Sequence, residues 1–553
     1  MAAILEAEHA RWTLVDALRV QAERFGERPA FIFEGDSDLS LSRLDRESDA
    51  CAAGLARLGV SPGDRVAIMA ENSAAFLIVF WAVQKRRAIL VPINSELKGD
   101  LLAHQLRDSL PKVIVADRDI GEVVALGLES LEAVIVTKSA FASANGLRSV
   151  SLDELCNEPQ AELVLSPTPE DICLILYTSG TSGRSKGVLI PEAHAYLFGL
   201  LQSRALTLTS DDRFFVALPL FHVNALLMSL GACLLVGAQA YVVSKFSASR
   251  WVQQIRECSA TVTNCLGIMA EFVLRQPASG TDRNHNLRAV MAVPVSAQWG
   301  SAFEARFGVR LVQIYGMTEC NIVSFSDPGD PLEPGCIGPL ADEFFEVGII
   351  DPDTDRPVPN GAVGEIAVRP KVASAFMQGY LGLPEVTVHA WRNLWFHTGD
   401  AGWLDASSRL HFVDRIGDFI RRRGENISSF EIEAVLATHP GIAECAVVGV
   451  RVEGAGGEDE IKAVVVRADA RPTHAELLEW AVLRLPRYAV PRFWEFVDAL
   501  EKTPTGKIKK KELRNQGVTA RAWDRETQQK SRNGSVGSGS LVSQAASAKG
   551  PAK

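Results

Sequence analysis

The sequence predicts an α/β protein with a large N-terminal domain of βα-layered subdomains, a small β-barrel-like subdomain and a small α+β C-terminal domain. Three observations indicate this fold class. Apolar runs alternate with helical patterns over residues 12–110, short β-rich segments fill residues 335–415, and helices and strands alternate again over 416–520. A chain of 553 residues is also too long for one hydrophobic core, so two or more domains are expected.

The first region predicts parallel strands. An amphipathic helix opens at Leu14, and apolar runs at 65–69, 88–92 and 113–116 have the length and composition of buried strands. Strands separated by helices of ten or more residues are typical of parallel βαβ units. No ligand-binding pattern occurs here, so we expect this region to be scaffold.

Composition excludes several classes of protein. The net charge of −10 argues against a nucleic-acid partner, which normally needs a basic face. The nine cysteines are scattered, odd in number and never spaced C-x-x-C, which suits a reducing compartment and predicts no zinc site. The first twelve residues carry acidic side chains and no apolar segment, unlike a signal peptide. We therefore expect a cytoplasmic protein.

One uncharged stretch could be taken for a transmembrane segment. Residues 225–243 carry no charge and approach the length of a membrane span. Polar residues and glycines interrupt the stretch, and G-A-Q-A-Y-V-V at 237–243 is typical of a turn from a helix into a strand. We interpret it as a buried helix followed by a strand, and expect no transmembrane segment.

A loop rich in glycine and hydroxyl side chains follows the apolar run 172–177. The sequence from Tyr177 reads Y-T-S-G-T-S-G-R-S-K-G, and a second apolar run begins at Val188. Glycines let the backbone approach a ligand closely, and successive N–H groups in such a turn form a concavity that binds anions. With Lys186 as a point charge, the loop suits a polyphosphate.

Two other interpretations of this loop are a flexible linker and a P-loop. A flexible linker would rarely lie between two apolar runs and carry a lysine. A P-loop NTPase needs a Ser or Thr directly after the lysine, followed by a helix. Here Gly187 and an apolar run follow Lys186, so the residue that would hold magnesium is missing and the P-loop is rejected.

Further motifs follow in order. Residues 216–224 (V-A-L-P-L-F-H-V-N) predict a strand end bearing His222, and 313–319 read Q-I-Y-G-M-T-E. An aromatic face suits a purine, and a carboxylate is the usual protein ligand of Mg²⁺ that bridges phosphates. W-F-H-T-G-D at 395–400 ends on Asp400, a carboxylate suited to accept hydrogen bonds from ribose hydroxyls.

The C-terminal region supplies the last motifs. Asp414–Arg415 is followed by R-R-R-G-E-N-I at 421–427, and P-T-G-K at 504–507 is expected to form a tight turn. Residues 528–553 are rich in Gly, Ser and Ala and are expected to be disordered. Domain boundaries follow at 1–415 and 416–520.

Together these motifs resemble the adenylate-forming superfamily of acyl-CoA synthetases, peptide-synthetase adenylation domains and luciferases. The resemblance covers roughly residues 1–515 and is nearest to crotonobetaine/carnitine–CoA ligases. It implies a C-terminal domain that rotates about Gly417, with CoA reaching a tunnel lined by Gly424, Glu425 and Asn426. It also implies an ATP site made of Thr178, Ser179, Gly180, Thr181, Ser182, Gly183, Lys186, Val293, Pro294, Gln313, Tyr315, Gly316, Met317, Asp400, Arg415 and Arg421.

The resemblance also implies catalytic roles. Tyr315 stacks on adenine, Thr318 bonds the α-phosphate and Glu319 holds magnesium, while Arg415 contacts ribose or phosphate. Lys507 reaches the substrate carboxylate, and His222 lies beside it. The acyl pocket is expected to be lined by His222, Val223, Asn224, Met317 and Cys320.

The implied activity is that of an AMP-forming acyl-CoA synthetase. A carboxylate attacks Mg·ATP to give acyl-AMP and pyrophosphate, and CoA then displaces AMP. The residues expected to line the acyl pocket predict an apolar, bulky acid. The sequence does not decide whether the chain forms a homodimer. The alternatives are a stand-alone enzyme that loads a carrier protein, a luciferase-like oxygenase and a non-catalytic nucleotide-binding module.

Overall fold

The computed structural model describes most of the chain between residues 8 and 527. The described ranges are 8–137, 147–157, 163–178, 185–295, 299–352, 354–416, 420–422, 425–427, 429–452, 459–468, 471–485, 487, 489–502 and 508–527. These residues form two compact units, the first within 8–416 and the second within 420–527. The predicted Lys507, Gly417, Gly424 and Ser179–Gly183, and the expected disordered tail, lie outside the described residues.

An eight-stranded sheet forms one layer of the first unit. In spatial order its strands are β20 (Gly379–Tyr380), β9 (Lys186–Pro191), β8 (Ile172–Thr178), β4 (Ile89–Pro92), β3 (Arg65–Met69), β5 (Val113–Ala116), β6 (Ala133–Val136) and β7 (Arg148–Ser151). The strands from β8 to β7 run parallel, whereas β9 and β20 are antiparallel to their neighbours. The parallel strands expected at 65–69, 88–92 and 113–116 are confirmed.

A seven-stranded sheet forms a second layer. Its order is β14 (Arg310–Val312), β13 (Ala289–Val293), β12 (Val262–Leu266), β10 (Arg213–Val216), β11 (Gln239–Val242), β1 (Pro29–Phe33) and β2 (Leu39–Ser40). Only β2 is antiparallel to its neighbour. The helices of the two layers are η1 (His9–Arg11), α2 (Leu14–Phe25), α3 (Leu41–Arg57), α4 (Ala74–Gln84), α5 (Gly99–Ser109), α6 (Gly121–Ala125), α7 (Leu152–Leu155), α10 (Trp251–Glu257), α11 (Gly267–Leu274) and α12 (Gly300–Phe307).

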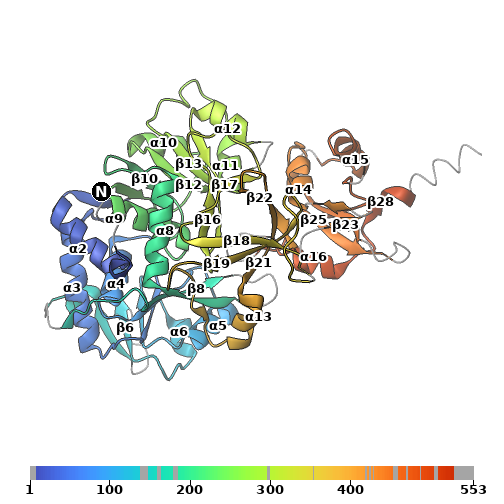
Figure 1. Cartoon of the computed structure of the whole chain (residues 1–553). Helices are drawn as coiled ribbons and strands as arrows, with labels where there is room; N and C mark the ends of the chain where they lie inside the picture. The colour runs from blue at the N-terminus through green and yellow to red at the C-terminus, as the bar shows by residue number, and fades with distance from the viewer. Residues whose placement is uncertain are drawn as a thin grey trace, which may run out of the picture. The chain divides into compact units, whose positions relative to one another are not determined.

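Helix α8 (Glu192–Ala205) runs through the middle of the first unit (Figure 1). Thirteen of its fourteen residues are buried, so it is covered on all sides, as a helix between two layers must be. It packs against the π-helix η3 (Asn224–Gly231), α9 (Ala232–Val236) and β16 (Asn321–Phe325). The helix and strand expected at 225–243 are thus confirmed. Among the described residues, no helix is both long and apolar enough to cross a membrane.

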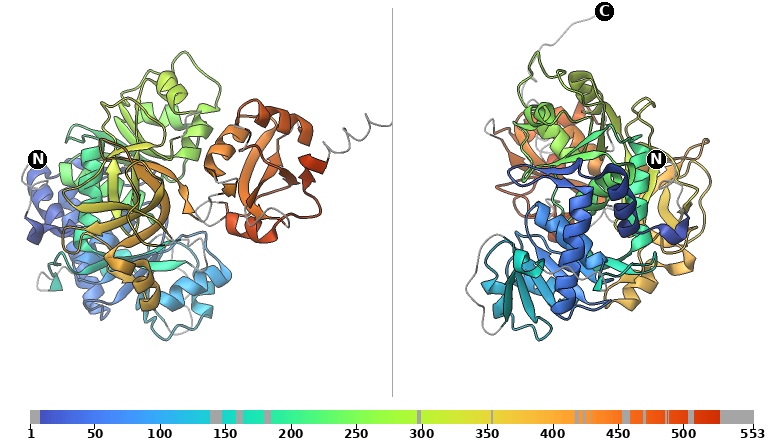
Figure 2. Two further views of the ribbon diagram at one scale, coloured as in Figure 1. Left: turned by 45° about the vertical axis from the view of Figure 1, so that its right-hand side comes forward. Right: turned by 90° about the vertical axis from the view of Figure 1, so that its left-hand side faces the viewer.

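The β-rich region forms a third sheet. Its five antiparallel strands are, in order, β17 (Cys336–Pro339), β22 (Arg409–Arg415), β21 (Phe396–Leu404), β19 (Gly364–Pro370) and β18 (Phe345–Ile350). The hairpin β15 (Ile314–Met317) and β16 precedes it, and α13 (Pro384–Ala390) and η4 (Arg392–Leu394) lie between β20 and β21. Figure 2 shows these strands in yellow and ochre as a layer of their own.

The second unit has its own core. A four-stranded sheet, β25 (Ile442–Arg451), β26 (Asp459–Arg467), β27 (Phe493–Val497) and β28 (Trp523–Asp524), packs with α14 (Ser429–Ala437), α15 (His474–Val482) and α16 (Lys510–Gln516). The fully buried Trp494 lies within the main cluster of apolar side chains. A separate two-stranded hairpin, β23 (Ile420–Arg422) and β24 (Glu425–Ile427), begins the described part of this unit.

Candidate active site

Tyr315, Asp400 and Arg415 meet in the first unit. The Tyr315 hydroxyl donates to Asp400 Oδ2 at 3.0 Å, and Arg415 Nε lies 3.1 Å from Asp400 Oδ1. Tyr315 and Asp400 are 6% and 4% exposed. Burial, and secondly the Asp400 charge, raise the pKa of Tyr315 well above its ordinary value, so the phenol stays a donor. Asp400 and Arg415 are direct partners on the paired strands β21 and β22, whereas Tyr315 comes from β15, a distant part of the sequence.

The turn that carries Asp400 is held from behind. Glu365 Oε1 accepts the Gly399 N–H at 2.9 Å, and Thr398 Oγ1 accepts the Asp400 N–H at 3.1 Å. Gly399 has φ +69°, a left-handed conformation that favours glycine. His397 Nδ1 lies 2.8 Å from Glu365 Oε2. His397 is buried and supports this turn through Glu365.

A second carboxylate, Glu319, follows β15 in the same hairpin. It is 6% exposed, and its Oε1 accepts a hydrogen bond from the Tyr380 hydroxyl at 3.1 Å. Lys186 Nζ lies 4.4 Å from the centroid of the Tyr380 ring, a cation–π contact. Within the described part of the chain, no basic side chain forms an ion pair with Glu319. A buried carboxylate without a cationic partner is suited to bind a cation.

The backbone around Thr318 is fixed by α8. His194 Nε2 lies 3.0 Å from the Thr318 carbonyl, and Asn321 Nδ2 donates to the His194 carbonyl at 2.9 Å. Burial lowers the pKa of His194 to about 4, so this ring is neutral at physiological pH. Asn321 has φ +68°, which reverses the chain between β15 and β16. Neither His194 nor Asn321 was among the site residues predicted from the sequence.

The glycine- and hydroxyl-rich loop connects two paired strands. Thr178 of β8 lies directly opposite Lys186 of β9 in the antiparallel register. The described ends of the loop also contact α5. The Tyr177 hydroxyl donates to Asp108 Oδ2 at 2.7 Å, and His104 Nε2 lies 2.8 Å from the Ser185 carbonyl.

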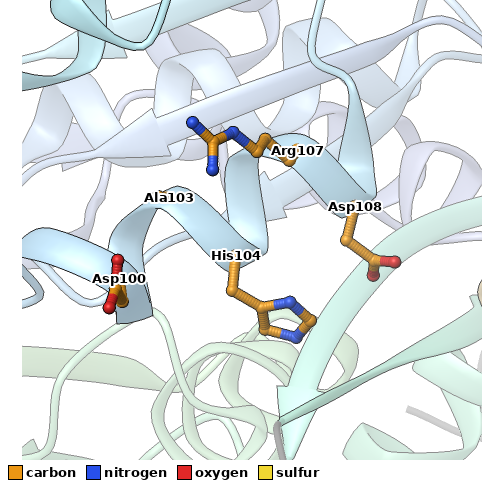
Figure 3. A pocket seen from close by; sticks show the side chains of 5 residues that line it. All are labelled: Asp100, Ala103, His104, Arg107 and Asp108. Carbon is orange, nitrogen blue, oxygen red and sulfur yellow. The ribbon is translucent and has the colours of Figure 1, made fainter.

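A surface hollow of about 350 Å³ lies along α5 (Figure 3). His104 and Asp108 point to the same side of the helix, and Arg107 points away from them. The lining residues are Asp100, Ala103, His104, Arg107 and Asp108. Because acidic and basic groups are mixed here, the hollow itself carries no strong preference for an anion.

Family models match both units. Residues 18–381 match the AMP-binding enzyme model, and residues 431–507 match the AMP-binding enzyme C-terminal domain model. Curated relatives include the crotonobetaine/carnitine–CoA ligases of Salmonella paratyphi A and Salmonella typhi. Each is 32% identical over 507 residues, covering 89% of this chain and 97% of the relative.

The chain belongs to the AMP-binding enzyme family. It is an acid–thiol ligase of the AMP-forming type. Solved structures agree with this assignment. An anthranilate CoA ligase in complex with anthranoyl-AMP superposes with a TM-score of 0.82 at 25% identity, covering 92% of this chain and 98% of the other. ATP-bound MatB from Rhodopseudomonas palustris gives 0.79 at 25% identity, covering 91% and 98%.

The segment expected to face the acyl group follows β10 in this AMP-binding enzyme. His222 lies in a loop beyond the end of β10, not on the strand end that the sequence predicted, because the strand stops at Val216. Asn72 fixes this loop, since its side chain donates to Leu218 O at 3.1 Å and accepts from Leu220 N at 2.9 Å.

The neighbouring predicted residues differ in exposure. Val223 and Asn224 are half-buried, and Asn224 Oδ1 accepts a hydrogen bond from Asn264 Nδ2 at 2.9 Å. Cys320 is fully buried. The roles of these side chains in an acyl pocket stay predictions.

The remaining predicted ATP-site residues lie in two places. Val293 is half-buried and Pro294 is exposed at the end of β13, while Gly316 and Met317 lie on β15 beside Tyr315. Gln313 is buried, and its amide donates to Glu333 O at 2.9 Å and to Cys336 O at 2.8 Å. The Gln313 side chain therefore supports the 333–336 loop in this structure.

Three predicted residues of the second unit fall on one hairpin. Arg421 pairs with Asn426, and Arg422 pairs with Glu425, in the antiparallel register of β23 and β24. The sequence placed Arg421, Glu425 and Asn426 beside the nucleotide and the CoA tunnel. The hairpin brings their backbones together, and their roles stay predictions.

Proposed function

We propose that this acid–thiol ligase activates a small-molecule carboxylic acid with ATP and Mg²⁺ and then transfers the acyl group to CoA. In the first step the carboxylate oxygen attacks the α-phosphorus, forming acyl-AMP and releasing pyrophosphate. In the second step the CoA sulfur attacks the acyl carbon, and AMP leaves as the carbon–oxygen bond breaks. The observation that supports this best is the meeting of Tyr315, Asp400 and Arg415, with Glu319 in the same β15–β16 hairpin as Tyr315.

The Asp400 side of the site fits a nucleoside. A buried carboxylate that already contacts a guanidinium can accept hydrogen bonds from neutral hydroxyls without a large desolvation cost. Tyr315 presents an aromatic ring beside it, suited to stack on adenine. Arg415, which is 37% exposed in its side chain, can also contact the ribose or the α-phosphate. Binding in this orientation positions the phosphates for in-line attack.

The Glu319 side fits a magnesium ion. Its carboxylate is buried, accepts one hydrogen bond from Tyr380, and has no cationic partner among the described side chains. Oxygen ligands are those that Mg²⁺ prefers, so Glu319 would hold it. When bound, Mg²⁺ neutralises phosphate charge, which lowers the repulsion between two anionic substrates. Lys186, opposite Thr178, would add a second positive charge.

The acid is proposed to be apolar and bulky, from the wall residues His222, Val223, Asn224, Met317 and Cys320. The named relatives act on crotonobetaine and carnitine, so these two acids belong in any substrate panel. CoA is proposed as the acceptor because the named relatives are CoA ligases. A carrier-protein thiol is the competing acceptor and is one outcome of the test.

The second unit is proposed to serve both half-reactions in turn. Lys507 would neutralise the carboxylate and α-phosphate during adenylation. Rotation about Gly417 would then bring the hairpin with Arg421, Glu425 and Asn426 to the site for thioester formation.

Replacing Lys507 by Ala tests this directly. We expect Lys507→Ala to lower adenylate formation by about 10²- to 10³-fold, the loss typical for one charge-stabilising group. Thioester formation from supplied acyl-AMP should remain within about threefold of wild type.

The matched control is Lys511→Ala, a lysine four residues further on. Equal losses in both half-reactions would contradict the two-arrangement proposal, although not the ligase activity. If acyl-AMP forms but only an added carrier protein, and not CoA, accepts the acyl group, the acceptor proposal is wrong.

A further inference from the structure

Three side chains with different metal-binding atoms converge beside the five-stranded sheet. Glu333, Cys336 and His411 each offer one ligand atom, and these atoms lie within 4.8 Å of one another. Cys336 and His411 are buried, and Glu333 is exposed. This cluster lies wholly in the first unit and shares no residue with the proposed ATP or acyl sites.

The backbone holds the three residues in place. Cys336 of β17 is the direct partner of His411 of β22 in the antiparallel register, so both side chains project from the same face. The Cys336 N–H donates to the Glu333 carbonyl at 3.1 Å, which folds Glu333 back over the strand end. The two hydrogen bonds from Gln313 to Glu333 O and Cys336 O fix this turn further.

The imidazole is oriented as in many metal sites. His411 Nε2 lies 3.3 Å from Asp405 Oδ2, and the ring stacks on Trp403 with centroids 3.9 Å apart and planes 13° apart. Metal-ligating histidines usually donate their second ring N–H to a carboxylate, which fixes the tautomer and the ring plane. Asp405 supplies a carboxylate beside the ring here.

Two of the three residues border a small cavity. Glu333 and Cys336 line a cavity of about 20 Å³, together with Gln313, Ser326, Asp330 and Arg409. This volume is close to what a single water molecule needs, so a ligand much larger than a water molecule or a single ion does not fit. Arg409 Nη2 lies 3.2 Å from Glu333 Oε2, so an incoming cation competes with this guanidinium for one ligand.

We propose that Glu333, Cys336 and His411 form a binding site for one zinc ion per chain. Thiolate, imidazole and carboxylate together select zinc over magnesium or calcium, which prefer all-oxygen ligands. Three protein ligands leave a fourth position for water. Because Arg409 competes for Glu333, we expect zinc to bind less tightly here than at the closed four-ligand sites that hold structural zinc. This proposal does not depend on the proposed function.

The test uses the full-length protein, stripped with a chelator, and Zn²⁺ or Co²⁺ alone as probe. We expect one equivalent of metal per chain in a competition with a chromophoric chelator. Saturation with Co²⁺ should give the near-ultraviolet sulfur-to-cobalt absorption band that reports a thiolate ligand. Cys336→Ser should abolish this band and weaken Zn²⁺ binding by about 100-fold, and Glu333→Gln should weaken binding by about tenfold.

Two controls match these variants. Cys258 is as buried as Cys336, both being 4% exposed, and Cys258→Ser should leave the band and the affinity unchanged. Glu343 is an exposed glutamate paired with Arg204, as Glu333 is with Arg409, and Glu343→Gln should bind zinc like wild type. A missing cobalt band, a band that survives in Cys336→Ser, or equal affinities of the Glu333→Gln and Glu343→Gln variants would overturn the proposal. Glu333 is exposed, so its variant keeps the test valid even if Cys336→Ser misfolds.

Discussion

Asp400 and Glu319 are both buried carboxylates of the first unit, and they differ in what surrounds them. Asp400 contacts the Tyr315 hydroxyl and the Arg415 guanidinium, and its turn is held by Glu365 and Thr398. Glu319 accepts a hydrogen bond from Tyr380 and, among the described residues, forms no ion pair.

This difference indicates a division of labour. A carboxylate whose charge is already balanced suits neutral hydroxyl donors, whereas a buried carboxylate without a counter-charge gains most from a cation. The same residue type can therefore serve the ribose on one side and the metal on the other. The predictions below test this division, from the largest expected effect to the smallest.

Glu319→Gln should have the largest effect. The substitution keeps the side-chain shape and an acceptor for Tyr380, and it removes the charge proposed to hold Mg²⁺. We expect kcat/KM for adenylation to fall about 10³-fold, and the Mg²⁺ concentration for half-maximal activity to rise. Adenylation rates measured across a Mg²⁺ titration test this, with Glu343→Gln as the control. An unchanged Mg²⁺ requirement would show that Glu319 is not the metal ligand.

Asp400→Asn should act on nucleotide binding instead. An amide accepts hydrogen bonds more weakly than a carboxylate and leaves Arg415 without its partner. We expect KM for ATP to rise by about 10- to 100-fold, with little change in the Mg²⁺ requirement. Initial-rate kinetics in ATP test this, and the exposed Asp211→Asn is the control. A shift in Mg²⁺ dependence as large as that of Glu319→Gln would contradict the division of labour.

Tyr380→Phe should have a smaller effect on the Glu319 side alone. It removes the 3.1 Å hydrogen bond to Glu319 and keeps the ring beneath Lys186. The net value of one such hydrogen bond is about 1 kcal/mol, so adenylation should slow by about fivefold. The measurement is kcat/KM at saturating Mg²⁺. A rise in KM for ATP as large as that of Asp400→Asn would contradict the assignment of Tyr380 to the Glu319 side of the site.

Glu192→Gln should change stability with little effect on catalysis. Burial, helped by the nearby charges of Asp171 and Asp16, raises the pKa of Glu192 to about 8, although the hydrogen bond from Leu14 N acts in the opposite direction. The folded chain therefore keeps this proton while the unfolded chain loses it above about pH 4.5, so wild-type stability falls as pH rises from about 5 to 8. Glutamine cannot ionise, so the variant should lose this contribution to the pH dependence.

Melting temperatures of the first unit at pH 5 and pH 8 measure this effect. We expect the wild type to lose a few degrees more than the variant over that interval. The exposed Glu385→Gln serves as the control. Identical pH dependence of wild type and Glu192→Gln would contradict a protonated Glu192 in the folded state.

The sequence predicted the fold class and the local elements, because apolar periodicity and turn residues are local signals. The strands at 65–69, 88–92 and 113–116 and the helix and strand within 225–243 are examples. It also singled out segments expected to carry chemistry, because Gly-rich turns and the Tyr315–Glu319 segment have distinctive composition, and these site assignments stay predictions.

Contacts between distant segments could not be predicted in this way. Tyr380 reaches Glu319, and His194 reaches Thr318, across elements that are far apart in the sequence, and no local pattern marks either residue. The same holds for Glu333, Cys336 and His411, because cysteine spacing alone excluded a zinc motif and only the pairing of β17 with β22 brings the ligands together. His222 was placed on a strand because the apolar run 216–220 continues past Val216, where Pro219 and the Asn72 contacts end the strand.

Pyrophosphate exchange tests the central proposal most directly. Wild-type protein is incubated with ATP, Mg²⁺, labelled pyrophosphate and each acid of a carboxylate panel, without CoA. We predict that label enters ATP only when a suitable acid is present, because acyl-AMP forms before CoA is needed. An adenylate mechanism would be contradicted by three results together. Product would form only when CoA is present from the outset, phosphate would be released instead of pyrophosphate, and no acid that is consumed would support exchange.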